Sequence, residues 1–426
     1  MIYREQRYSP EMLHRPEIRA LVDETAAIIC GAVDSSLPHE VPETVRYALE
    51  NNAFVFSGFK TFHSMREIGL SMVTDKGDIK PFNDFMADVK KINQMYNHNY
   101  LRAEYNHAVG SSLMAARWLD YEKDADRYNL QYRTANDGRV REEHAILHDT
   151  TLPPSDPFWD KYYPPNGWNC RCTVVQVLKE DYSVSDSDLA MKRGDNCTAG
   201  VKQQIFRYNP GKSLQLFPPK HPYYKTPTEA KPIIEDVARY QHNKAIYNRL
   251  KEDKNYTDVE FDEATGGVKA THKGHSIQDA DNTETFFGNM KPADLERECQ
   301  NLLFKWGHTA VLRDEFANKR RGNTPPSLDI EIDGKIMDIR SITQGGLFGY
   351  ALRSKNSQLG NVKKKTGIIS DCVCLHFHDP DMFSEEKLLR DATWFKKIMK
   401  ELGTTQRIKH IYVVVNGENK LRIYDI

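Results

Sequence analysis

Apolar residues recur at helical spacing through the first 130 residues of the chain. The longest such pattern, over residues 81–126, predicts a long helix or a pair of helices. Shorter helices are predicted over residues 21–33 and from Pro42 onward, since proline suits the first turn of a helix. A stripe of aromatic and aliphatic side chains at this spacing is typical of a packed core. The N-terminal domain is therefore predicted to be mostly helical.

The last third of the chain changes to short apolar runs bounded by turn residues. Strands are predicted over residues 309–312, 328–332, 335–339, 371–377, 408–415 and 421–424, and helices over residues 293–306 and 385–402. Asp333-Gly334 is the clearest hairpin signal in the chain. The order of these elements predicts a compact α+β module.

Proline clusters separate the two regions. Residues 181–230 have no sustained apolar period, which predicts a linker or a surface-wrapping arm, and a helical patch follows over residues 233–250. The expected fold class is α+β multidomain. A mostly helical domain is expected over residues 1–180, a proline-containing linker and helical arm over residues 181–258, and a compact α+β domain over residues 259–426.

Residues 133–178 show neither a helical nor a strand period, because prolines, glycines and asparagines interrupt them repeatedly. Aromatic side chains could give this irregular segment a small core of its own: Phe158, Trp159, Tyr162, Tyr163 and Trp168. His144, Cys170 and Cys172 could hold a structural zinc ion, with His148 or Cys197 as a fourth ligand. The competing interpretation is that both cysteines are simply buried and that His144 caps a turn.

The composition narrows the class of protein. With 59 basic and 60 acidic residues the formal net charge is −1, so any binding of nucleic acid must use local patches. No segment approaches the apolar length of a membrane span, and no apolar signal core follows the N-terminus. Seven cysteines, an odd and scattered set, favour a reducing cytoplasm over a disulfide framework.

Three pieces of the irregular segment together resemble a known family. They are the Arg-x-x-x-Asp-x-Arg-Val-Arg-x-x-His run from Arg133 to His144, the Asp156-Pro-Phe-Trp element, and the Pro-Pro-Asn-Gly-Trp-Asn-Cys-Arg-Cys run that ends at Cys172. This combination resembles the phage Mu F-like head morphogenesis domain of minor head proteins in tailed phages. The resemblance implies phage portal or capsid proteins as partners and a location in the virion or the bacterial cytoplasm. The lack of a long apolar segment predicts that no membrane is a partner.

Charged residues cluster along the predicted hairpin of the C-terminal domain. Alternation places Asp329 and Glu331 on one face of the first strand, and Asp338 and Arg340 on one face of the second. For an isolated hairpin these would be solvent-exposed ion pairs. Basic residues elsewhere in the domain could instead grip a phosphodiester beside these carboxylates: Lys319, Arg320, Arg321, Lys363, Lys364 and Lys365.

Residues 266–426 resemble the C-terminal toxin nucleases attached to phage head proteins and to contact-dependent inhibition systems. These form the barnase/EndoU/colicin/RelE-like group, including the CdiA C-terminal tRNase type. The helix that ends in Trp-Gly307-His308, the following Glu315 and the 328–341 hairpin carry the resemblance. It implies an endoribonuclease toxin that cleaves tRNA by transesterification without a cofactor, and a cognate immunity protein as a further partner. The implied catalytic residues are Asp329, Asp338, Arg340, Glu315 and His275, with His272 as the alternative histidine.

Two other interpretations of this domain stay open. Glu298, Asp329 and the Asp338-x-Arg340 pair also lie where a PD-(D/E)xK nuclease, which requires magnesium, would place its helix glutamate, its metal-binding aspartate and its (D/E)xK residues. The sequence departs from that motif at Arg340, because arginine cannot deprotonate as the lysine of the motif can. Leu328 also stands where the motif has proline. In the third interpretation the domain is an inert structural part of the phage head.

Overall fold

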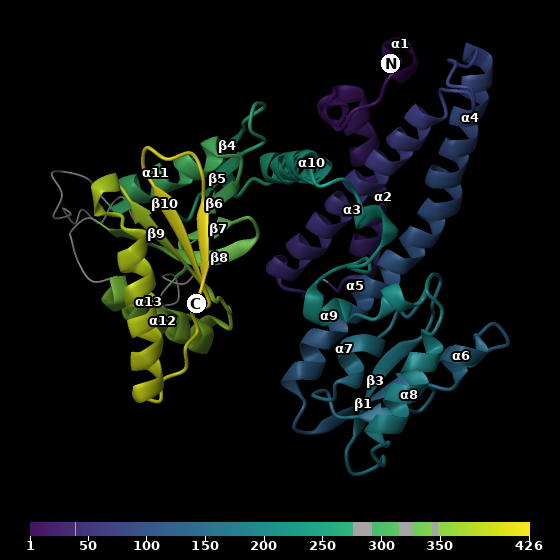
Figure 1. The fold of residues 1–426 in the computed structure, drawn as a ribbon. Helices are drawn as coiled ribbons and strands as arrows, with labels where there is room; N and C mark the ends of the chain where they lie inside the picture. The colour runs from purple at the N-terminus through teal and green to yellow at the C-terminus, as the bar shows by residue number, and fades with distance from the viewer. Residues whose placement is uncertain (39, 276–291, 315–326, 343–347) are drawn as a thin grey trace. The chain divides into compact units, whose positions relative to one another are not determined.

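A computed structural model describes residues 1–38, 40–275, 292–314, 327–342 and 348–426 of the chain (Figure 1). The chain divides into two compact units, Met1–Gln241 and His242–Ile426. Each unit has its own hydrophobic core, and the two are described separately below. As predicted, the N-terminal region is mostly helical, and the C-terminal region is rich in sheet. No helix among the described residues is long and apolar enough to cross a membrane.

Long helices form the body of unit 1. They are α2 (Pro16–Ser36), α3 (Glu43–Leu70), α4 (Phe82–Gln94) and α5 (Leu101–Lys123), preceded by the short α1 (Ile2–Glu5) and a 3₁₀ turn, Pro10–His14. Pro42 and Pro81 stand immediately before α3 and α4, as expected of residues that cannot donate a helical hydrogen bond. A π-helical segment, Met95–Tyr100, joins α4 to α5. The long helical stretch predicted over residues 81–126 is therefore confirmed.

The irregular segment is built on a small antiparallel sheet that the sequence pattern did not predict. The sheet has the order β2-β1-β3, with β1 at Tyr128–Arg133, β2 at Thr151–Leu152 and β3 at Thr173–Leu178. Two short helices, α6 (Glu142–Ala145) and α7 (Phe158–Tyr162), lie in its connections. The predicted aromatic core is present, since four side chains are completely buried together: Phe158, Trp159, Tyr162 and Tyr163. Trp168 is half-buried and packs instead against the main helical core.

Residues 181–230 are not a loose linker. They form α8 (Ser187–Cys197), α9 (Pro210–Ser213) and two 3₁₀ turns, Gln204–Phe206 and Pro222–Tyr224. Phe217 stacks on Phe56 of α3 with 3.6 Å between ring centroids, and Tyr208 contacts His107 of α5 at 3.1 Å. The prediction that few contacts cross this segment is wrong, because its aromatic residues are spaced too irregularly to show a period yet complete the core of unit 1.

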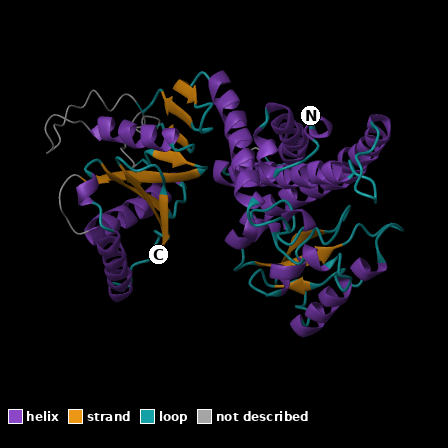
Figure 2. Ribbon diagram, turned by 45° about the horizontal axis from the view of Figure 1, so that its top comes forward, coloured by secondary structure: helices purple, strands orange, loops and turns teal. Residues whose placement is uncertain are grey.

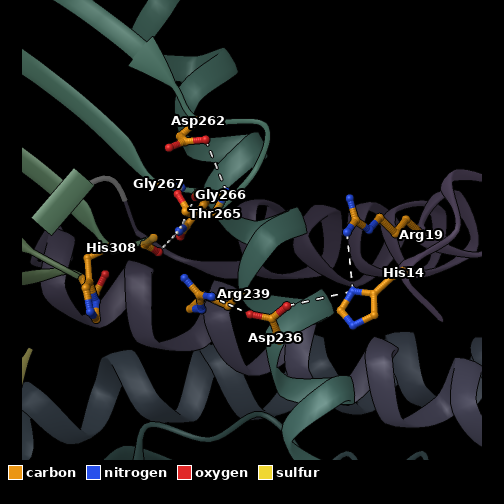
Figure 3. A network of polar contacts seen from close by, with 12 residues as sticks. His14, Arg19, Asp236, Arg239, Asp262, Thr265, Gly266, Gly267 and His308 are labelled. Carbon is orange, nitrogen blue, oxygen red and sulfur yellow. Dashed lines mark hydrogen bonds and ion pairs between the residues drawn. The ribbon is translucent and has the colours of Figure 1, made fainter. Parts of the chain in front are cut away.

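Helix α10 (Ala230–Glu252) contains the boundary between the two units. In unit 1, Asp236 of this helix accepts a hydrogen bond from Arg239 at 2.5 Å and lies 4.0 Å from His14 (Figure 3). In unit 2, a tight turn from Asp262 to Gly267 closes through a hydrogen bond from the Asp262 N–H to the Gly267 carbonyl at 2.9 Å. Asn243, in the second half of the helix, donates hydrogen bonds to the Gly266 and Gly307 carbonyls at 2.8 and 3.1 Å, so each half of the helix has contacts within its own unit.

The described residues of unit 2 form an eight-stranded mixed sheet with helices packed on both of its faces (Figure 2). Its strand order is β11-β10-β9-β8-β7-β6-β5-β4. The strands are β4 (Tyr256–Phe261), β5 (Val268–His272), β6 (Thr309–Leu312), β7 (Ile330–Ile332), β8 (Lys335–Ile342), β9 (Cys372–Phe377), β10 (His410–Val415) and β11 (Arg422–Asp425). Strands β8, β9 and β10 run parallel, as do β5 and β6, whereas the other neighbours are antiparallel.

The two faces of this sheet have separate cores. Helix α11 (Pro292–Lys305) covers one face, and helices α12 (Phe348–Thr366) and α13 (Glu385–Glu401) contribute to the core on the other. The predicted hairpin is confirmed at Asp333 and Gly334, whose φ angles of 46° and 74° are those of a tight two-residue turn. Helix α12 was not predicted, because glycine and lysine residues obscure its apolar positions.

Candidate functional site

His144, Cys170 and Cys172 come together in unit 1. His144 lies in α6, and the two cysteines lie in the loop that leads into β3. Asp137 accepts two hydrogen bonds from Arg171, at 2.6 and 2.7 Å, and so ties this loop to the segment before α6. The ligand atoms of the three residues all lie within 4.8 Å of one another.

The distances in this cluster suit a tetrahedral zinc ion. The Sγ atoms of Cys170 and Cys172 lie 3.7 and 3.6 Å from Nδ1 of His144. Typical zinc–sulfur and zinc–nitrogen bonds at a tetrahedral angle separate the two ligand atoms by about 3.6 Å. His144 is 3% exposed and Cys172 is 8% exposed. Both sulfur–nitrogen separations therefore match those of a tetrahedral zinc site.

Thiolate chemistry is also favoured at this position. A hydrogen bond from Cys172 and the nearby His144 hold the pKa of Cys170 well below its ordinary value. The same hydrogen bond and burial raise the pKa of Cys172 above its ordinary value. Cys170 is therefore the more readily deprotonated of the two cysteines.

Neither of the predicted fourth ligands belongs to this cluster in the described part of the chain. Nδ1 of His148 accepts a hydrogen bond from the Thr134 amide at 3.1 Å, and Nε2 lies 3.5 Å from Asp149. Cys197 is packed in the aromatic core, where burial raises the pKa of its thiol to about 12. The three cluster residues line a cavity of about 50 Å³, whose lining also includes Arg139, Arg141 and Arg171.

In unit 2, Asp338 is not on an exposed strand face as alternation had suggested. It is 2% exposed and forms an ion pair with Lys355 of α12. Gln358, one turn further along α12, donates a hydrogen bond to Asp338 Oδ1 at 2.6 Å. Asp329 lies beside it and accepts a hydrogen bond from the Ile339 amide at 2.8 Å. The aspartates are therefore adjacent, as predicted, but α12 covers Asp338.

The remaining predicted catalytic residues do not join this pair. Arg340 is exposed on β8. His275 follows β5 and pairs with Glu296 at 3.1 Å. Strands β6 and β7 lie between β5 and β8, the strand of Asp338. Three strand spacings, or about 14 Å, therefore separate β5 from β8. His272 lies on the same distant strand, 3.9 Å from Asp314. Glu315 lies outside the described residues.

The predicted basic residues have mixed outcomes. Lys319, Arg320 and Arg321 lie outside the described residues. Lys363, Lys364 and Lys365 are exposed, but they occupy the last turn of helix α12 rather than a loop. Cations at a helix C-terminus interact favourably with the helix dipole, which gives these lysines a structural reason to be there.

A second polar cluster lies on the opposite face of the sheet, under α11. Glu298 of α11 accepts a hydrogen bond from Nδ1 of His378 at 2.6 Å and lies 3.5 Å from Nε2 of His376. Ser341 contacts Nδ1 of His376 at 3.0 Å. Burial lowers the pKa of His376 to about 4, so its imidazole is neutral near pH 7. Glu298 therefore contacts these histidines on the other face of the sheet from Asp338, whereas the PD-(D/E)xK interpretation places it beside Asp338.

This cluster has the better position for binding a ligand. Ser341, His376 and Asn416 lie at the carboxyl ends of the parallel strands β8, β9 and β10, the edge where open α/β sheets bind ligands. A pocket of about 380 Å³ opens there, lined by residues that include Glu298, Arg297, Lys305 and Asn416. The sequence analysis missed His376 and His378 as site residues because only the parallel pairing brings their strand ends beside α11.

Residues 80–175 match the family model "Phage Mu protein F like protein". The chain is 45% identical over 71 residues to "Putative capsid assembly protein F" of Escherichia phage Mu, which covers 16% of each chain. It is 37% identical over 82 residues to "Mu-like prophage FluMu F protein" of Haemophilus influenzae, which covers 19% of each chain. No solved structure matches the chain. Residues 80–175, which include α4, α5 and the His144–Cys170–Cys172 cluster, therefore form a phage Mu F-like domain.

Proposed function

We propose that this chain is a head assembly protein of a Mu-like phage or prophage. The match over residues 80–175 carries this proposal, because it includes the loop that positions Cys170 and Cys172 as well as helices α4 and α5. Phage portal or capsid proteins are the expected partners, and the virion or the cytoplasm of the host bacterium is the expected location.

Deletion of the gene from an inducible prophage tests this role. The deletion strain should release tails but few filled heads when its lysate is examined by electron microscopy. The intact gene supplied in trans should restore filled heads, and mass spectrometry should detect the chain in purified particles. A normal yield of infectious particles from the deletion strain would contradict the proposal.

We further propose that unit 2 is a ribonuclease whose reactive groups lie at the carboxyl edge of β8, β9 and β10. The observation that favours it is the Glu298–His378 contact of 2.6 Å beside the 380 Å³ pocket. A carboxylate that accepts the Nδ1 proton of a histidine leaves Nε2 free to act as a base, and His378 is 39% exposed. His376, fully buried, is a positioning residue that faces the same carboxylate.

The reaction is a transesterification. Nε2 of His378 takes the proton of a ribose 2′-OH, and the 2′-oxygen attacks the adjacent phosphorus. The bond from phosphorus to the 5′-oxygen breaks, and the histidine returns its proton to that oxygen, which leaves a 2′,3′-cyclic phosphate. Arg297 and Lys305, which line the same pocket, would stabilise the charge on the phosphate. No metal ion is needed in this mechanism, and tRNA remains the proposed substrate.

Cleavage of total tRNA by the full-length protein, with and without EDTA, tests the assignment. Cleavage should persist in EDTA and should fall at least 100-fold in Glu298→Gln and His378→Gln. His410→Gln is a matched control, because His410 of β10 forms a similar contact, at 2.7 Å, with Asp425 of the edge strand β11, and this variant should stay active. Cleavage that requires magnesium and is lost in Asp338→Asn would favour the PD-(D/E)xK interpretation. Absence of any RNA or DNA cleavage would leave unit 2 with a structural role.

A further inference from the structure

We infer that His144, Cys170 and Cys172 bind a zinc ion through three protein ligands, and that the open fourth position takes a carboxylate. The inference does not depend on the proposed ribonuclease, since it concerns unit 1 alone. It differs from the closed, four-ligand site that the sequence suggested.

The ligand geometry carries the first part of the inference. The two S···N separations of 3.7 and 3.6 Å agree with about 3.6 Å for tetrahedral zinc. Three such groups converge although 26 and 28 residues of irregular chain separate the cysteines from the histidine. The strands β1 and β3 already pair the ends of this segment, so a metal ion would tie α6 to the loop before β3.

The surroundings of the cluster leave the fourth position open. Neither His148 nor Cys197 reaches it in the described part of the chain. Zinc sites with three protein ligands ordinarily keep a position for water or a substrate atom. The adjacent cavity of about 50 Å³ is several times the space of about 10–15 Å³ that one water molecule needs. An oxygen ligand from outside the chain therefore has room.

The charge around the cavity selects an anion. Zinc with two thiolates and a neutral imidazole has no net charge, whereas three arginine residues line the cavity: Arg139, Arg141 and Arg171. Asp137 pairs with Arg171 and lies 3.5 Å from Arg139, so it offsets only part of this positive charge. Arg141 is held by the Trp168 carbonyl at 2.6 Å, with its other nitrogen 3.4 Å from Nε2 of His144. A guanidinium group so placed can bind a second carboxylate oxygen.

Metal analysis of the full-length protein, purified under reducing conditions, tests the ligands. One zinc per chain is expected in the wild type. Cys172→Ser should lose at least 90% of it, whereas Cys30→Ser, which changes a cysteine outside the cluster, should retain it. Circular dichroism of each variant separates loss of metal from loss of fold. A wild-type protein that contains no zinc and takes up none on reconstitution would overturn the inference, as would full retention of zinc in Cys172→Ser.

Cobalt substitution tests the open position. The visible spectrum of the cobalt protein should change saturably as acetate is added, and Arg141→Gln should weaken acetate binding at least threefold without loss of cobalt. A spectrum that acetate leaves unchanged would show a closed site. Loss of cobalt in Cys197→Ser would identify the missing fourth ligand and would likewise refute the open position.

Discussion

The buried ion pair between Lys60 of α3 and Glu104 of α5 offers a sharp test of how the Mu F-like domain is anchored. Glu104 lies within residues 80–175, whereas Lys60 lies outside them. The two side chains are 2% and 3% exposed. Tyr223 also donates a hydrogen bond to Glu104, at 3.3 Å. Replacing Lys60 by methionine keeps the length of the side chain but removes the charge that balances the carboxylate.

We expect Lys60→Met to lower the free energy of unfolding of unit 1 by about 3–5 kcal/mol, the usual effect of leaving a buried charge unpaired. Burial already raises the pKa of Glu104 above its ordinary value, with Lys60 opposing the shift. Lys60→Met removes this opposing effect, so the pKa of Glu104 should rise further in the variant. A carboxyl whose folded-state pKa is raised stabilises the fold below its unfolded-state pKa and loses that contribution as the pH rises. The deficit relative to wild type should therefore be smallest near pH 4.5 and should grow toward pH 8.

Hydrogen exchange measured by mass spectrometry on peptides from α3 and α5 follows unit 1 separately from unit 2. The expected loss corresponds to exchange that is roughly 10²–10⁴ times faster, since each tenfold change is about 1.4 kcal/mol. Lys60→Met combined with Glu104→Gln is the matched control. It should recover most of the protection, because no charge remains buried and Tyr223 keeps an acceptor. A loss below about 1 kcal/mol with no pH dependence would refute the claim that the carboxylate is desolvated.

Three further predictions concern other buried groups. Burial lowers the pKa of His107 to about 3, so its contribution to the stability of unit 1 is present above pH 6.5 and is lost as the pH falls toward 3. Between these pH values, His107→Gln should reduce the dependence of the unfolding free energy on pH by about 1.4 kcal/mol per pH unit. A Cβ on Gly211 would lie 2.2 Å from Cβ of the buried Trp118. Gly211→Ala should therefore destabilise the protein by about 1–3 kcal/mol in urea unfolding, whereas Gly31→Ala, with open space around it, should not. Lys355→Met should destabilise unit 2 by about 3–5 kcal/mol because it leaves Asp338 unpaired, and Arg340→Ala, at an exposed position, should change its thermal unfolding little.

Local patterns in the sequence predicted much of the secondary structure. The helical period over residues 81–126, the prolines before α3 and α4, and the Asp333-Gly334 turn all act between residues close in the chain. Such local patterns favour the same helix or turn whatever the segment packs against. The sequence alone is therefore sufficient to predict these elements. The same reasoning applies to the pieces of the Mu F-like signature, which are short and contiguous.

The candidate sites depended more on the tertiary structure. The sequence predicted that His144, Cys170 and Cys172 could converge, because their ligand chemistry is distinctive. It did not predict that, in the described part of the chain, His148 and Cys197 would lie outside this cluster. In unit 2 the sequence placed Asp338 on an exposed strand face, which helix α12 covers. It also assigned no role to His378, because a histidine after a buried strand has no distinctive local pattern.

The sequence by itself thus determined the long helices of unit 1, most strands of unit 2 and the turn between β7 and β8, and it showed which segment resembles a phage head protein. The tertiary structure decided which of their side chains meet. Glu298 and His378 are 80 residues apart, and Lys60 and Glu104 are 44 residues apart. Such pairs form only when helices pack and strands align in parallel, and those arrangements minimise the exposed apolar surface of a whole unit rather than the energy of any one segment.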